Sequence, residues 1–232
     1  MKRYWWLLLL SMFSVQSCIQ EDPGPQQLDS RNYAMLDFDR VDVSAALSVK
    51  IVQGTAYSVR AEGDRRNLED LSVRKNGTTL EVGYLNTRDR QYATYVTITM
   101  PNIKGATCSG AVNVQLTGFT QASRVDLVLT GASLLQAEVT ATEMVVNVSG
   151  SSQLRLVGTA PKLDGTLTGS SLLTAFDFAV NDCQLVVSGA SVCKVKVDHL
   201  LKVNASGASE VSYQGSPQLD VITSGASLVR AD

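Results

Sequence analysis

A four-residue motif recurs seven times between residues 109 and 227 of this 232-residue chain. It consists of Ser or Thr, then Gly, then Ala or Ser, and in six copies a final Ser. Its glycines, spaced 18 to 21 residues apart, are Gly110, Gly131, Gly150, Gly169, Gly189, Gly207 and Gly225. Self-similarity at a period of about 20 residues is typical of stacked repeats, in which each unit buries its apolar face against its neighbours. The motif therefore restricts the chain to a repeat architecture.

Apolar residues occupy alternate positions on both sides of each motif glycine. Positions two, four and six before it, and four and six after it, are mostly Val, Leu, Ala, Met or Cys, and the positions between are mostly polar. This alternation predicts strands with one buried face. Each repeat is thus expected to be a strand, a tight corner and a second strand.

The corner chemistry has a structural interpretation. Glycine permits unusual backbone dihedrals, and the small residue after it lets successive corners stack. We expect the hydroxyl before each glycine to bond to neighbouring corners as a ladder. Seven equivalent serines or threonines without matching bases make no catalytic mechanism.

The same columns begin earlier, with Val41, Val43, Val49 and Ile51 apolar and Ala45 in the glycine position. Further alternating runs predict strands around 57–61, 80–84 and 96–100. Between them, Asp64 to Leu71 predicts one helical turn capped by Asp64.

The expected fold class is all-β, as a single domain over residues 33–232. We predict a right-handed, parallel β-helix-like solenoid of about nine or ten coils of ~19 residues, with Ser/Thr-Gly-Ala/Ser-Ser corners. An antiparallel meander or barrel is the alternative, because alternation and tight turns suit it as well.

Residues 1–17 have the features of a lipoprotein signal peptide. Lys2 and Arg3 precede an apolar run from Tyr4 to Val15, which is too short for a bilayer span of ~20 residues. Small residues then lead to Cys18, which predicts cleavage there and lipidation of Cys18. A general secretory signal with a chance cysteine is the alternative.

Residues 18–32 are polar and are expected to be a tether. The acidic pair Glu21 and Asp22 resembles a surface-export signal of some Gram-negative lipoproteins. We therefore expect a lipid-anchored protein of the outer membrane, with the cell surface favoured over the periplasmic face.

Composition removes several function classes. The formal net charge is −2, which argues against a nucleic-acid partner. A single histidine, His199, excludes a multi-histidine metal site, and we expect it in a solvated turn. No metal and no cofactor are predicted.

Three cysteines fall in aliphatic columns, namely Cys108, Cys183 and Cys193. Buried thiols filling apolar positions are the first interpretation. A disulfide between Cys183 and Cys193 stays open, since an oxidising envelope permits it.

Three carboxylates, Asp126, Asp164 and Asp220, share one outward column. Carboxylates on such a face are the basis for an enzyme hypothesis, a glycan-active β-helix protein of the polysaccharide lyase or hydrolase type. Val145, Gln184 and Lys202 interrupt the column, so no adjacent coils pair two of these acids, and no catalytic residue is predicted.

The segment from Leu85 to Tyr95 departs from the repeat. Arginine and tyrosine are favoured at interfaces, and loops on rigid scaffolds often carry binding. This predicts a ligand-binding loop for a glycan or protein, with Arg88, Arg90, Tyr92 and Tyr95. An ordinary polar hairpin loop is the alternative.

The stretch from Phe38 to Gly54 (FDRVDVSAALSVKIVQG), the strand VTITMP at 96–101 and the tandem SGAS corners resemble the family called putative auto-transporter adhesin, head GIN domain. The resemblance covers about residues 36–229. It implies a β-helix-like fold in an envelope-anchored protein of Gram-negative bacteria, and it brings no catalytic residues.

These observations favour a non-catalytic adhesion or scaffolding module. A glycan-active enzyme and an envelope-stress regulatory partner are the alternatives. Only seven residues follow Gly225, without a polar capping element. We expect another subunit, giving a homo-oligomer through the solenoid end, or the chain's own N-terminal part to cover the last coil.

Overall fold

The computed structural model describes residues 24–232. The predicted signal peptide, the predicted lipidation site Cys18 and the acidic pair Glu21 and Asp22 lie outside the described residues.

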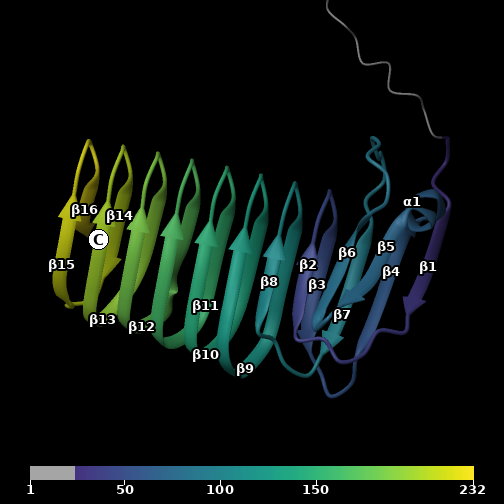
Figure 1. Ribbon diagram of the computed structural model, residues 1–232, viewed down its shortest axis with the longest axis horizontal. Coiled ribbons are helices and arrows are strands. Elements are labelled where there is room, and N and C mark those ends of the chain that lie inside the picture. The colour runs from purple at the N-terminus through teal and green to yellow at the C-terminus, as the bar shows by residue number, and fades with distance from the viewer. Residues whose placement is uncertain (1–23) are drawn as a thin grey trace, which may run out of the picture.

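The described chain is a β-solenoid of about seven turns (Figure 1). Its strands are β1 (Leu28–Tyr33), β2 (Arg40–Val43), β3 (Ser48–Gln53), β4 (Ser58–Asp64), β5 (Leu71–Asn76), β6 (Thr79–Tyr84), β7 (Tyr95–Met100), β8 (Gly105–Cys108), β9 (Asn113–Leu129), β10 (Leu134–Val148), β11 (Gln153–Leu167), β12 (Leu172–Val187), β13 (Val192–Ala205), β14 (Glu210–Gln214), β15 (Gln218–Thr223) and β16 (Leu228–Ala231). The one helix in this range is α1 (Arg65–Glu69), with Asp64 as its N-cap, as the sequence predicts.

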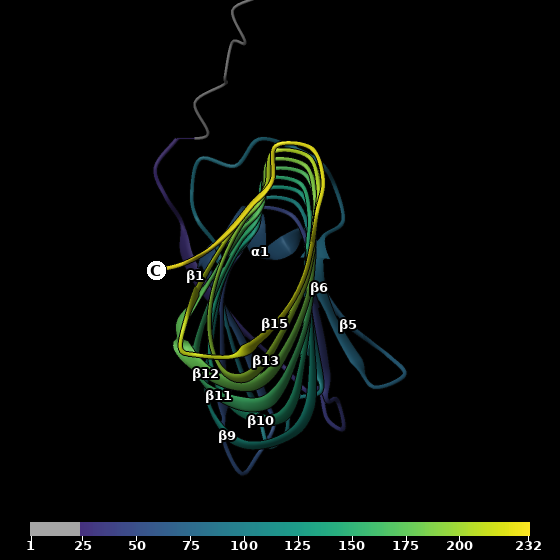
Figure 2. The ribbon, with the colours of Figure 1, turned by 90° about the vertical axis from the view of Figure 1, so that its left-hand side faces the viewer.

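Each long strand from β9 to β13 runs down one side of the rod, bends and climbs the other side (Figure 2). Face A is the sheet formed by β1, β4, β7, β3, the first halves of β9 to β13, β14 and β16. Face B is the sheet formed by β5, β6, β2, β8, the second halves of β9 to β13, and β15. The pairing between successive coils is parallel.

The predicted columns are in register. Val114, Leu135, Leu154 and Leu173 are direct neighbours on face A, and none is more than 1% exposed. Similar inward columns on face B fill the core between the two sheets. The predicted β-solenoid is thus confirmed, because parallel pairing across a constant period rules out the antiparallel meander.

The seven corner glycines have φ between +69° and +82°, a region that strains any residue with a Cβ atom. The residue after each glycine from Gly131 onward donates its N–H to the carbonyl of the preceding corner glycine, at 2.7–2.8 Å. A Cβ atom on Gly150 would lie 2.5 Å from the Gly131 carbonyl oxygen. These corners therefore favour glycine for two reasons, namely the positive φ of the backbone and the close approach of the neighbouring corner.

The hydroxyl ladder lies two residues after the glycine, not before it as expected. Five serines at this position are buried, namely Ser133, Ser152, Ser171, Ser191 and Ser209. Four of them donate to corner carbonyls, Ser171 donates to the carbonyl of Val148 just before a corner, and the hydroxyls of Ser171 and Ser191 lie 3.1 Å apart. Their side chains point into the rod, where an unbonded hydroxyl would be costly. The hydroxyl before the glycine lies nearer the surface, and Ser149 donates its hydroxyl to Leu129 at 3.3 Å.

Ala45 occupies the glycine position of the first corner, between β2 and β3. Its φ is +67°, close to the values of the glycines. The backbone of Ala45 lies against Gly110, where a Cβ atom would be 3.3 Å from the Ala45 nitrogen. The first corner therefore stacks on the second with a residue that is strained there.

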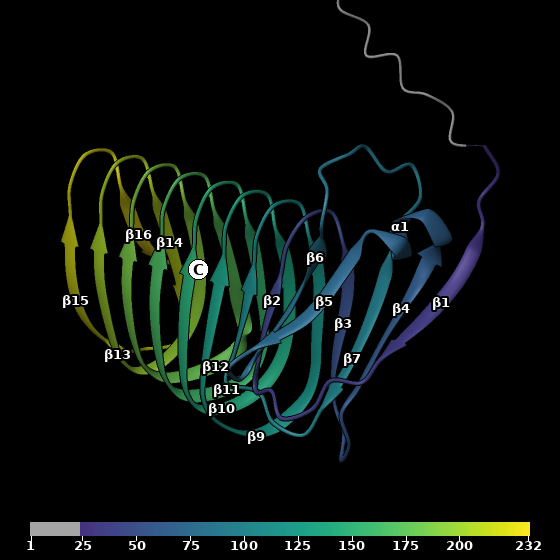
Figure 3. The same cartoon turned by 45° about the vertical axis from the view of Figure 1, so that its right-hand side comes forward.

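The expected count of nine or ten coils is too high, because the N-terminal strands do not all wind as coils. β1 pairs antiparallel with β4, β4 pairs antiparallel with β7, and β5 pairs antiparallel with β6. Together with α1 they form a cap on the first end of the rod (Figure 3). Alternation alone does not separate these strands from coil strands, since both bury one face.

The predicted tether is also shorter than expected. Residues 28–33 form the edge strand β1, which is paired along its whole length with β4. Its burial is low, and the backbone pairing of an edge strand leaves no apolar signature in the sequence.

The described N-terminal strands lie at the end of the rod opposite β15 and β16 (Figure 1). The expectation that they cover the last coil is therefore wrong for residues 24–100.

Replacing a corner glycine by alanine should be costly in proportion to the contact that its Cβ atom meets. Gly150→Ala adds both dihedral strain and a clash with backbone, so we expect a loss of about 3 kcal/mol in the free energy of unfolding. Gly110→Ala, with its nearest contact at 3.3 Å, should lose about 1–2 kcal/mol. Urea unfolding followed by circular dichroism measures both, and equal losses would refute the close-approach argument.

The opposite change at the first corner should stabilise the protein. Ala45→Gly relieves the positive φ, and after the extra chain entropy of glycine we expect a gain of about 0.5–1 kcal/mol. Ala46→Gly, at the exposed next position, is the matched control and should lose stability. A loss for Ala45→Gly in the same urea experiment would contradict the strain.

Candidate functional site

The predicted binding loop, Leu85 to Tyr95, crosses the top of the cap between β6 and β7, and its last residue, Tyr95, is the first residue of β7. The side chain of Arg90, a residue of this loop, is only 10% exposed and forms an ion pair with Asp70. The central carbon of its guanidinium lies 3.5 Å from the centre of the Tyr84 ring. Its guanidinium also donates to the carbonyls of Asn86 and Arg88 at 2.9 and 3.0 Å. Arg90 therefore holds the loop in shape.

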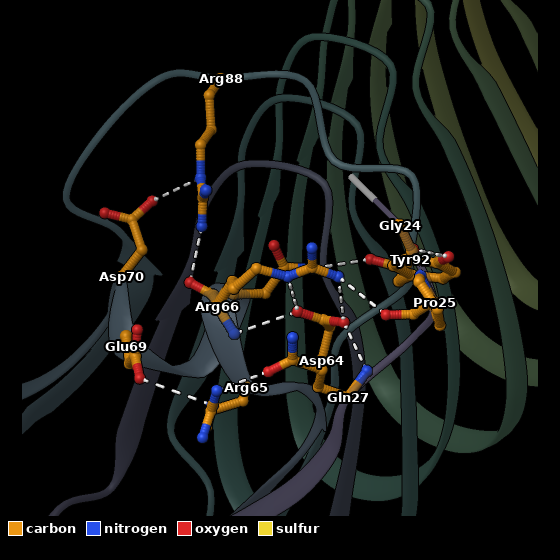
Figure 4. A network of polar contacts seen from close by, with 11 residues as sticks. Gly24, Pro25, Gln27, Asp64, Arg65, Arg66, Glu69, Asp70, Arg88 and Tyr92 are labelled. Carbon is orange, nitrogen blue, oxygen red and sulfur yellow. Dashed lines mark hydrogen bonds and ion pairs between the residues drawn. The ribbon is translucent and has the colours of Figure 1, made fainter. Parts of the chain in front are cut away.

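Two other predicted residues bind the loop to its surroundings (Figure 4). Arg88 donates to the carbonyl of Arg66 at 2.6 Å and lies 3.6 Å from the Asp70 carboxylate. The Tyr92 hydroxyl donates to the carbonyl of Gly24 at 2.7 Å. Both side chains thus make intrachain contacts, which a ligand would have to share or replace.

Asp64 fastens the start of the described chain to the same cap (Figure 4). Its carboxylate is 1% exposed and accepts from the backbone N–H groups of Gln27 and Arg66, at 2.9 and 3.0 Å. The Arg66 guanidinium forms two further hydrogen bonds to it, at 2.7 and 2.8 Å. The hydrogen bonds from Arg66 hold the pKa of Asp64 well below its usual range, despite burial.

Tyr95 differs from the other three predicted residues. It begins β7 on face A, and it is 58% exposed. It lies at one end of a depression of about 330 Å³, lined also by Lys50, Thr97, Asn113 and Gln115. Tyr95 thus presents an aromatic ring beside an open polar surface.

A second depression of about 230 Å³ continues from the first, because both are lined by Gln115. Its other polar residues are Thr117, Gln136, Glu138 and Arg155. We call the surface lined by Tyr95, Lys50, Gln115, Gln136 and Arg155 the polar groove. Sequence reasoning missed it, although alternation places these outward residues on strands that stack.

The groove has a regular spacing. Thr97, Lys50, Gln115, Gln136 and Arg155 occupy one column of paired residues, one per strand. Neighbouring strands lie ~4.8 Å apart. The column therefore offers hydroxyl, amide and cationic groups at even intervals, and Glu138 is the only carboxylate among the residues that line the two depressions.

The predicted carboxylate column lies on face B, in the expected order. The register runs Asp126, Val145, Asp164, Gln184, Lys202, Asp220. Basic residues neutralise it through ion pairs of 2.8–3.4 Å that join Arg40, Asp126, Arg124, Glu143, Lys162 and Asp164. Burial raises the pKa of Asp126, but hydrogen bonds from Arg40 and Arg124 outweigh it and the pKa is lowered. Asp126 and Asp164 are therefore bound in a structural network, whereas Asp220 has only Lys202 near it, at 3.9 Å.

A different pair of carboxylates lines a depression on face B of the cap. Asp42 and Glu81 are paired residues on β2 and β6, and the depression of about 490 Å³ also contains Arg74 and Tyr84. Burial and the charge of Glu81 raise the pKa of Asp42, whereas hydrogen bonds from Arg74 and Asn76 lower that of Glu81. Sequence reasoning missed this pair, because the register of β2 against β6 is not visible in the chain.

The model of the putative auto-transporter adhesin, head GIN domain family matches residues 37–217. The chain belongs to this family. The predicted resemblance is confirmed, and the match ends before β15 and β16. No functionally curated protein matches the sequence.

Solved structures similar to this head GIN domain share its fold. A putative adhesin from Bacteroides fragilis has a TM-score of 0.79 at 18% identity, covering 90% of this chain and 98% of that one. A putative adhesin from Parabacteroides distasonis has a TM-score of 0.73 at 18% identity, with the same coverages. A putative lipid binding protein from Parabacteroides distasonis has a TM-score of 0.66 at 14% identity, covering 88% of this chain and 96% of that one.

The three predicted buried thiols of the head GIN domain are free and buried. Cys183 and Cys193 therefore do not form the disulfide that the sequence left open. Burial raises the pKa of Cys108 to about 12, and it raises the pKa of Cys183 and Cys193 as well. Thiols in this state are poor nucleophiles.

Little else in residues 24–232 offers reactive chemistry. His199 lies on the outside of β13, 75% exposed, with its Nδ1 atom 2.6 Å from the Asp182 carboxylate. In this range no group of three or more His, Cys, Asp or Glu side chains could hold a metal ion. The described part of the chain also contains no helix long and apolar enough to cross a membrane.

The Asp64 contacts should make cap stability depend on pH. The pKa of Asp64 is lowered in the folded state, so its contribution is complete above the unfolded value of about 3.9 and is lost as the pH falls through the folded pKa. Asp64→Asn should cost about 2 kcal/mol or more at pH 7, and this difference should shrink below pH 4.

Urea unfolding of both proteins at pH 7 and pH 3 measures the difference. Asp29→Asn, at an exposed position of β1, is the control and should change little at either pH. A difference between Asp64→Asn and the unmodified protein that does not change with pH would contradict the role of the charge.

Proposed function

We propose that this protein is a non-catalytic binding module of the cell envelope, and that the polar groove on face A binds an extended glycan. The observation that carries the proposal is the even column of hydroxyl, amide and cationic side chains beside the exposed ring of Tyr95. A few well-placed polar groups on a rigid scaffold fix the orientation of a ligand, and a tyrosine adds apolar contact at little entropic cost. Membership of an adhesin-named family supports a binding role.

The rigidity of the site supports the same proposal. The groove residues stand on paired strands with a buried face, so their backbone positions do not depend on a loop. An extended polymer lying along the rod would meet one polar side chain per strand. Arg88, Arg90 and Tyr92 stay predicted ligand residues, but substituting them also removes contacts that shape the cap.

The experiment is a glycan array probed with the purified full chain, followed by titration of any glycan bound. Tyr95→Ala and Gln115→Ala should each weaken binding about tenfold, the effect of losing ~1–2 kcal/mol. Gln184→Ala is the matched control, because Gln184 is an exposed glutamine in a depression on face B. Unchanged affinity in both groove variants would overturn the proposal.

The bound glycan should be recovered intact, as mass spectrometry after incubation can show. Cleavage that is abolished by Asp42→Asn would instead support the glycan-active enzyme, the second candidate, which the carboxylates of Asp42 and Glu81 favour. Binding to peptides but to no glycan would point to a protein ligand and would overturn the glycan proposal.

The envelope location is proposed from the sequence of residues 1–22, with a lipid on Cys18 as the anchor. Gly24 lies at the capped end of the rod, so an anchor six residues earlier would hold the cap within ~20 Å of the membrane. Incorporation of a labelled fatty acid that is lost in Cys18→Ala would support this anchor. Cell-surface display would be tested by added protease on intact cells.

A further inference from the structure

The open end of the rod has unpaired strands with exposed apolar side chains. β15 and β16 form the outer border of the last described coil (Figure 2). Leu219, Val221, Ile222 and Leu228 are 46%, 37%, 63% and 51% exposed. Leu219 and Val221 belong to inward columns whose members are buried in every earlier coil, for example Leu201 and Val203. Unpaired strands of this kind are templates for pairing with another chain.

We propose that this end binds a second copy of the same chain, with β15 of each copy pairing antiparallel with β16 of the other. A two-fold axis parallel to the strands exchanges face A and face B, and it places the ascending β15 beside the descending β16 of the partner. The two rods would then join into one solenoid, with a cap at each far end.

The direction of the backbone groups fits this pairing. Ser224 donates its N–H to Ala205 on the inner side, so alternate residues Leu219, Val221 and Thr223 turn their N–H and C=O groups to the open side. Leu228 and Asp232 donate to Ser209 and Tyr213 on the inner side. Ser227, Val229 and Ala231 therefore face the open side in β16.

The heights of these groups also agree. Apolar and corner positions are arranged symmetrically about Gly225. A two-fold axis parallel to the strands does not change the position of a residue along the strand direction. The residues brought together are Leu219 with Ala231, Val221 with Val229, and Thr223 with Ser227. Each is a pair in which both residues turn their backbone groups to the open side, as a hydrogen-bonded antiparallel pair requires.

The side chains between these pairs are complementary. The same register places Asp220 opposite Arg230, and Ile222 opposite Leu228, at the non-hydrogen-bonded positions where side chains approach most closely. Within one chain, Asp220 lies 3.9 Å from Lys202, and Arg230 lies 2.7 Å from Glu210. The contact would thus continue an alternating row of charges, Lys202, Asp220, Arg230 and Glu210, across the two copies.

The charges at this contact can be exchanged in a way that separates pairing from folding. Asp220→Arg alone places Arg opposite Arg in both halves of a dimer, and Arg230→Asp alone places Asp opposite Asp. Mixing the two variants restores an opposite-charge pair in each half. We expect the full chain to sediment at twice the chain mass, each variant alone to dimerise at least tenfold more weakly, and the mixture to recover dimers.

Sedimentation equilibrium of the full chain over about 1–100 μM protein measures these states. Asp177→Arg, at an outward carboxylate in the middle of the rod, is the matched control and should leave dimerisation unchanged. Circular dichroism checks that each variant is folded. A monomer at every concentration, undiminished dimers in Asp220→Arg, or a mixture that stays monomeric would each overturn the proposal.

Discussion

The stacked corner is the contact on which the rest of this protein depends. At the corners from Gly131 to Gly207, a glycine with positive φ accepts a hydrogen bond at its carbonyl from the next coil, and a Cβ atom would lie within 2.7 Å of the preceding corner's carbonyl oxygen. This fixes the offset between successive coils at one repeat of 18 to 21 residues. Because side chains alternate with period two, a fixed offset aligns every inward column and every outward column at once. The buried serines two residues later add a second set of hydrogen bonds on the inner side of the same corner.

The outer surface follows from that alignment. On face B it brings acids and bases into one row of ion pairs, which accounts for carboxylates that resemble a catalytic arrangement in the sequence. On face A it brings amides, hydroxyls and cations into the polar groove. Exposed ion pairs contribute little stability individually. One such pair reaches the polar groove, where Arg155 lies 2.7 Å from Asp177.

The two ends of the rod differ in how their strands and core are covered. At the first end, antiparallel strands, α1 and a loop fastened by Arg88, Arg90 and Tyr92 close the core. At the other end the last coil keeps its unpaired strands and half-exposed apolar columns. In a stacked fold only the interior coils have neighbours on both sides, so the core and the strand edges are open to solvent at each end unless something covers them.

The amino-acid sequence by itself determined the repeat fold, the strand pattern, the capped turn at Asp64, the buried cysteines and the family. These depend on local rules, namely period-two alternation, the conformational freedom of glycine and helix capping, which act over a few residues. The tertiary structure alone decided that residues 28–33 form an edge strand, that the hydroxyl ladder follows the glycine, and that Arg90 supports the loop. It also decided which outward residues meet, as Gln115 meets Gln136 and Asp42 meets Glu81. Such contacts join residues 20 or more positions apart, and their partners are chosen by register and packing rather than by neighbouring sequence.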